Sequence, residues 1–70
     1  MYTNNDMKVD RIYEILTDNG IDTWSFMQTV NRYQAKRLSL INRPISEQMA
    51  HEAHFAEALQ RWENRISWWI

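Results

Sequence analysis

The chain has 70 residues, a net charge of −1 and no cysteine. A chain this short forms one small domain, residues 1–70, and without cysteine it has neither a disulfide nor a thiolate metal ligand. The small net charge argues against an acidic mimic of DNA and against strong nonspecific binding to nucleic acid. The lack of cysteine fits a reducing compartment, and we expect a cytoplasmic protein.

The first residues have neither the basic nor the apolar region of a signal peptide, and no apolar run approaches the ~20 residues that cross a bilayer. The final Trp68 and Trp69 are residues that favour lipid interfaces. However, the polar residues of the same segment mix glutamate with arginine, whereas a surface-bound helix favours lysine and arginine. We therefore expect no membrane association.

The first predicted helix covers about residues 6–18, where apolar residues between Val9 and Leu16 recur at helical spacing. Asp6 or Asn5 is the expected N-cap, and residues 1–5 are expected to form a frayed tail. Gly20, the only glycine, stands where a left-handed residue closes a helix, and Ile21 follows where the accompanying hydrophobic contact belongs.

The second predicted helix covers about residues 23–42, with Asp22 as its cap and Pro44 as its stop, because the residue before a proline is disfavoured in a helix. Arg37 is the one charged residue inside its apolar face, so we expect it to pair with Glu52 of the third helix. Three further basic residues share the side roughly opposite that face: Arg32, Lys36 and Arg43.

The third predicted helix covers about residues 46–69, with Ser46 as its cap. Its large apolar residues fall at intervals of three and four, which is the period of one helical stripe: Phe55, Leu59, Trp62, Ile66 and Trp69. This stripe carries the most aromatic surface in the chain, and we expect all five residues to pack in the core. No segment alternates with the period of a strand. The sequence therefore predicts an all-α protein of three helices.

Short turns predict that successive helices are antiparallel, with helices 2 and 3 forming a long hairpin. Residues equidistant from the turn then face each other, which places Val30 near Leu59 and Phe26 or Met27 near Trp62. Helix 1 is too short to cover the turn end of the hairpin. The apolar residues left uncovered there are Leu38, Ile41, Ile45, Met49, Ala53 and Ala56.

Glu47, His51 and His54 lie on one side of the third predicted helix and could offer three metal ligands. With no fourth ligand visible, we interpret them as a solvated polar face and expect no metal and no cofactor. A bundle of this size rarely encloses a catalytic pocket, so we also expect no catalytic residues and no enzyme activity.

The sequence favours a small, non-enzymatic protein–protein interaction module that acts stoichiometrically, such as an inhibitor, an antitoxin-like factor or an accessory factor of a virus or mobile element. The uncovered apolar residues predict an interface, most simply that of a homodimer, and Trp68 is a further candidate contact. The alternative is a dimeric DNA-binding regulator that contacts phosphates through Arg32, Lys36 and Arg43.

Overall fold

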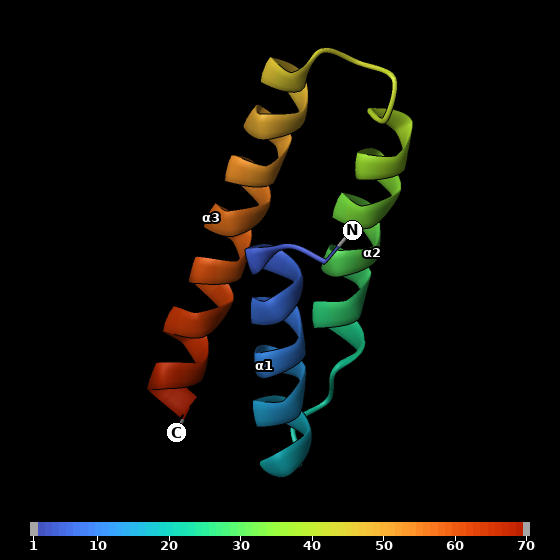
Figure 1. Ribbon diagram of the computed structural model, residues 1–70. Helices are drawn as coiled ribbons and strands as arrows, with labels where there is room; N and C mark the ends of the chain where they lie inside the picture. Colours follow the sequence, from blue (N-terminus) through green and yellow to red (C-terminus); the bar gives the residue numbers. More distant parts are fainter. Residues whose placement is uncertain (1, 70) are drawn as a thin grey trace.

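The computed structural model describes residues 2–69, which form three helices and no strand: α1 (Asn4–Asp18), α2 (Trp24–Ser39) and α3 (Ile45–Trp69). The predicted all-α fold is therefore confirmed. Figure 1 shows α2 and α3 as an antiparallel hairpin, with α1 lying along the half of it that is remote from the α2–α3 turn. The molecule measures 39 × 18 × 17 Å, and α1 packs mainly on α3.

α1 begins at Asn4, two residues earlier than predicted, because Thr3 and Asp6 form a capping box. The Thr3 hydroxyl accepts from the Asp6 N–H at 3.2 Å, and the Asp6 carboxylate accepts from the Thr3 N–H at 2.9 Å. The prediction that Asp6 or Asn5 is the cap is wrong, since both lie inside the helix. Asn5 is also buried, so residues 4 and 5 are not part of a tail.

The end of α1 is as predicted. Gly20 has a φ of +67°, the left-handed conformation that glycine adopts without strain. The Gly20 N–H donates to the Thr17 carbonyl at 3.2 Å, and the Ile21 N–H donates to the Leu16 carbonyl at 2.9 Å. These two bonds make a Schellman motif. Ile21 packs against the core, which redirects the chain into α2.

α2 begins at Trp24 after the N-cap Thr23, whose side chain makes no capping bond; instead the Asp22 carboxylate accepts from the Trp24 N–H at 3.1 Å. α2 ends at Ser39, three residues before the predicted end, so Pro44 does not stop it. The Ser39 hydroxyl donates to the Lys36 carbonyl at 2.7 Å, a bond that competes with the helical ladder and accompanies the break.

α3 begins directly after Pro44, whose carbonyl accepts from the N–H groups of Glu47 and Gln48. Ser46 therefore lies in the first turn and is not the cap. The Gln48 side chain closes the connection by donating to the Arg43 carbonyl at 2.9 Å. The α2–α3 turn is thus held by hydrogen bonds and exposes nearly all of its side chains.

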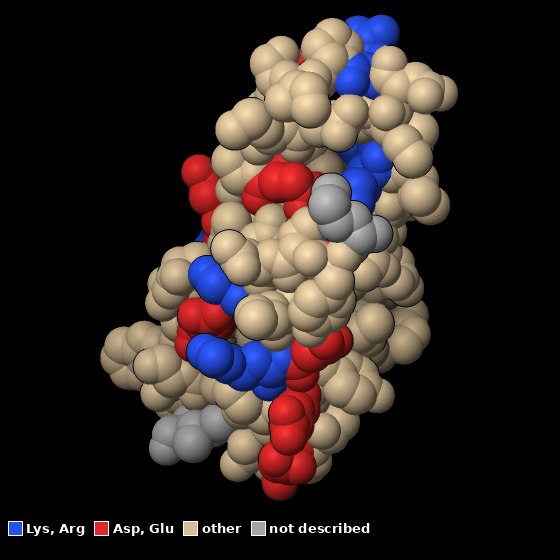
Figure 2. Space-filling view, viewed as in Figure 1, with Lys and Arg blue, Asp and Glu red and all other residues tan. Residues whose placement is uncertain are grey.

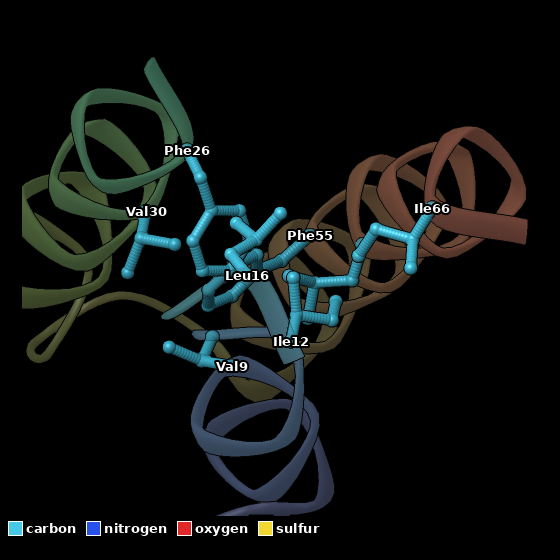
Figure 3. Packing of buried hydrophobic residues seen from close by; sticks show 8 residues of the cluster. Val9, Ile12, Leu16, Phe26, Val30, Phe55 and Ile66 are labelled. Carbon is cyan, nitrogen blue, oxygen red and sulfur yellow. The ribbon is translucent and has the colours of Figure 1, made fainter. Parts of the chain in front are cut away.

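The core lies where α1 covers the hairpin, and Figure 3 shows its side chains converging from all three helices: Val9, Ile12, Leu16, Phe26, Val30, Phe55, Leu59 and Ile66. The predicted register is confirmed, because Trp62 meets Phe26 edge-on with 5.3 Å between ring centroids. The core role predicted for Trp69 is wrong, since 54% of it is exposed. In this register α3 continues past the start of α2, so no α2 residue lies opposite Trp69.

Candidate interaction surfaces

A cluster of polar side chains joins the three helices at the N-terminal end of α1, and we call it the Arg37 cluster: Asn5, Asp6, Arg37 and Glu52. Arg37 donates to both carboxylate oxygens of Glu52, from Nη2 at 2.7 Å and from Nε at 3.0 Å, which confirms the predicted pair. Arg37 Nη1 also donates to Asp6 Oδ1 at 3.0 Å, a contact that was not predicted from the sequence. Asn5 Nδ2 donates to the Glu52 carbonyl at 2.9 Å.

The Arg37 cluster favours charged carboxylates. Hydrogen bonds from Arg37 lower the pKa of Glu52, and partial burial opposes that effect less strongly. For Asp6, partial burial acts to raise the pKa, but the bonds from the Thr3 N–H and from Arg37 outweigh it, so its pKa is also lowered. Each charged side chain of the cluster is paired with an opposite charge. The cluster therefore links the three helices to one another.

Beyond the Arg37 cluster, the turn end of the hairpin presents four large apolar side chains, which we call the hairpin-end surface: Leu38, Ile41, Ile45 and Met49. Their exposed fractions are 70%, 68%, 69% and 67%. Figure 1 shows that α1 stops short of this end, and in Figure 2 the same region carries few charged side chains. A groove of about 400 Å³ lies here, lined in part by Leu38, Leu40 and Ile41.

The other predicted interface residues are placed differently. Ala53 is exposed one turn along α3 from Met49, and Ala56 is half-buried. Trp68 is 89% exposed but lies ~28 Å from Met49 along the helix axis, at 1.5 Å per residue. The structure therefore does not bring Trp68 together with the hairpin-end surface.

A second groove, of about 720 Å³, lies between α2 and α3, and no residue of α1 lines it. Its lining includes four basic side chains, which define what we call the basic groove: Arg32 and Lys36 from α2, and Arg61 and Arg65 from α3. Arg43 does not line the groove; it pairs at 2.7 Å with Glu47, four residues further on, in the first turn of α3. Two of the three predicted phosphate contacts thus come together, and the third is elsewhere.

Arg61 and Arg65 were not among the predicted phosphate contacts, because the faces of each helix were considered separately and not across the α2–α3 pair. The signal was present in the hairpin register: Phe26 lies across from Trp62, so Arg61 and Arg65 continue along the groove beyond Arg32. Arg65 also lies over the Trp62 ring, 5.3 Å from its centroid, which holds the guanidinium at the groove.

The solvated face predicted for Glu47, His51 and His54 is present in part: Glu47 and His54 are exposed, but His51 is buried. Only 8% of His51 is exposed, and its Nε2 lies 2.8 Å from the Tyr33 carbonyl, to which it donates. Glu47 is bound to Arg43, and His54 is exposed beside the basic groove. Among residues 2–69, no group of three or more His, Cys, Asp or Glu side chains is arranged to hold a metal ion.

None of the helices within residues 2–69 combines the length and the apolar character that crossing a bilayer requires. Comparisons of the chain with protein-family models, with curated proteins and with solved structures found no match in any of the three. The inferences about function therefore rest on the two surfaces described above.

Proposed function

We propose that the protein is a small, non-enzymatic interaction protein that acts stoichiometrically and associates through its hairpin-end surface. The observation that carries this proposal is the exposure of Leu38, Ile41, Ile45 and Met49, each by about two thirds, at one end of a small domain. Contiguous exposed apolar surface of this kind usually marks an interface. The α2–α3 turn that carries part of this surface is held by backbone and Gln48 side-chain hydrogen bonds.

The partner that this surface fits best is a second copy of the chain. A twofold axis would place the same apolar residues against each other, which is the commonest closed solution for small oligomers. The ionic groups at its edges are already neutralised within the chain, since Arg43 pairs with Glu47 and Arg37 with Glu52. Two copies could therefore associate without placing unpaired charges of the same sign against each other at the centre of the interface.

The test compares two methionines that lie near the starts of helices. Met49 belongs to the hairpin-end surface and is 67% exposed, whereas Met7 lies on α1 and is 56% exposed. Aspartate near a helix N-terminus suits the helix dipole at both positions, so both variants should keep their helicity. Light scattering behind a sizing column should show that Met49→Asp dissociates the dimer and Met7→Asp does not.

The proposal fails if the two substitutions act alike, or if the parent chain is monomeric at tens of micromolar. The second result would assign the hairpin-end surface to a foreign protein.

A further inference from the structure

The basic groove concentrates positive charge on a chain whose net charge is −1. None of its four basic side chains forms an ion pair with another described residue, and no carboxylate lines the groove. By contrast, Arg37 and Arg43 are both paired. Four of the six Lys and Arg side chains that make no ion pair within residues 2–69 thus line one surface, where they can attract a polyanion; the other two, Lys8 and Arg11, lie on α1.

The four cations follow one another along the groove. Arg32 and Lys36 lie one turn apart on α2, and Arg61 and Arg65 lie one turn apart on α3. Because the helices are antiparallel with Phe26 level with Trp62, Arg61 and Arg65 extend the row that starts at Lys36. At 1.5 Å per residue the row is ~19 Å long, which is long enough to follow several consecutive phosphates of one strand.

The other lining residues suit a nucleic acid better than a protein. Tyr33 and Trp62 are the aromatic residues of the groove, and both are only half-buried: Phe55 stacks on one face of Tyr33 and Arg65 lies over the Trp62 ring, which leaves at most the second face of each ring for a base. Single-strand binding grooves combine cations with aromatic rings on which bases stack. Ser25 and Gln28 also line the groove, and hydroxyl and amide side chains of this kind commonly donate to phosphate and sugar oxygens.

A protein partner would need something the basic groove lacks. None of the large, exposed hydrophobic residues between positions 2 and 69 lines it, whereas protein interfaces have an apolar centre. A groove between neighbouring helices, whose axes are ~8–10 Å apart, also admits one backbone more readily than a duplex. We propose that the basic groove binds a single strand of nucleic acid, with Arg32, Lys36, Arg61 and Arg65 contacting its phosphates. This site is separate from the hairpin-end surface.

The acidic residues of α1 do not argue against this site. Asp10, Glu14 and Asp18 are exposed on a helix that does not line the groove. Interactions between exposed charges are largely screened beyond about 10 Å at 0.1 M salt. The carboxylates of α3, among them Glu47, Glu57 and Glu63, do not line the groove either, so a strand bound there would contact the four cations and no carboxylate.

The experiment measures binding of a fluorescein-labelled single-stranded DNA 12-mer by anisotropy, from 25 to 200 mM salt. The groove variant is the double substitution Arg32→Gln and Arg61→Gln. The matched control is Lys8→Gln and Arg11→Gln, which removes the same charge from α1. Arg32 and Arg61 are exposed and make no hydrogen bond or ion pair in the structure that their loss would break, so far-UV circular dichroism should show unchanged helicity in both variants.

Four phosphate contacts to a single strand predict a slope of about −2.8 for log affinity against log salt, at about −0.7 per contact. The groove variant should halve that slope and bind at least tenfold more weakly in 50 mM salt, while the control keeps the slope of the parent. Equal losses in the two variants, or no binding by the parent at 25 mM salt, would overturn the proposal. Displacement of the DNA by poly-glutamate at equal charge concentration would overturn it too, and would assign the groove to an acidic protein.

Discussion

Replacing Arg37 by methionine should destabilise the protein far more than the same replacement of Arg43. Arg37 donates to both Glu52 and Asp6, and the three side chains are only 28%, 29% and 13% exposed. Without Arg37, two carboxylates remain close together and partly removed from water. Breaking a fully buried pair costs ~3–5 kcal/mol, and breaking an exposed one costs under ~1 kcal/mol.

The Arg37 cluster lies between these limits and closer to the surface, so we expect a loss of about 1–2 kcal/mol, or a fall of roughly 5–15 °C in Tm for a domain of this size. Arg43 and Glu47 are 58% and 43% exposed, and Arg43→Met should leave Tm almost unchanged. Urea and thermal unfolding followed by far-UV circular dichroism measure both variants.

A double-mutant cycle of Arg37→Met with Glu52→Gln should show non-additive losses, because the second substitution removes a charge that the first leaves unpaired. If Arg37→Met lowers the stability no more than Arg43→Met does, or if the stability losses of Arg37→Met and Glu52→Gln are additive, the cluster does not hold the helices together.

Two further predictions concern acid and the core. The pKa values of Asp6 and Glu52 are lowered in the fold, so their stabilisation is complete above their ordinary values of 3.8 and 4.5 and is lost as the pH falls through the lower folded values. Tm should therefore drop below about pH 4.5, and less steeply in Arg37→Met; an equal slope in both proteins would contradict this cause. Trp62→Ala should lower the free energy of unfolding by about 3 kcal/mol, which is the lower end of the range for a large aromatic residue because Trp62 is half-buried. Trp68→Ala should leave the stability almost unchanged, because Trp68 is 89% exposed. Similar melting of these two variants would mean that Trp62 does not anchor the core.

The contacts that follow from periodicity and from turn position were predictable. Equal distance from the α2–α3 turn places Trp62 against Phe26 and Glu52 against Arg37, and both contacts are present. The uncovered hairpin end followed from the short length of the first helix. These features depend on the regular geometry of helices, which the sequence pattern expresses directly.

The features that were missed depend on short-range competition or on two helices together. Asp6 was assigned to a cap, whereas its two carboxylate oxygens bind Thr3 and Arg37 at once. His51 lies at the edge of the apolar face of α3. Whether its side chain reaches the Tyr33 carbonyl on α2 depends on how closely the two helices pack, which the pattern of one helix does not reveal. The basic groove takes Arg61 and Arg65 from one helix and Arg32 from another, so no single helix face reveals it.

Small-angle X-ray scattering of the parent chain tests self-association through the hairpin end most directly, because it reports mass and length together. One copy has a mass of 8.5 kDa, and its backbone extends 39 Å along the longest axis. Two copies joined at their hairpin ends should give twice that mass at tens of micromolar and a longest dimension well beyond 39 Å. A mass of 8.5 kDa, with a longest dimension that exceeds the 39 Å backbone extent only by side chains and hydration, would contradict the dimer, and a doubled mass without the added length would place the interface elsewhere.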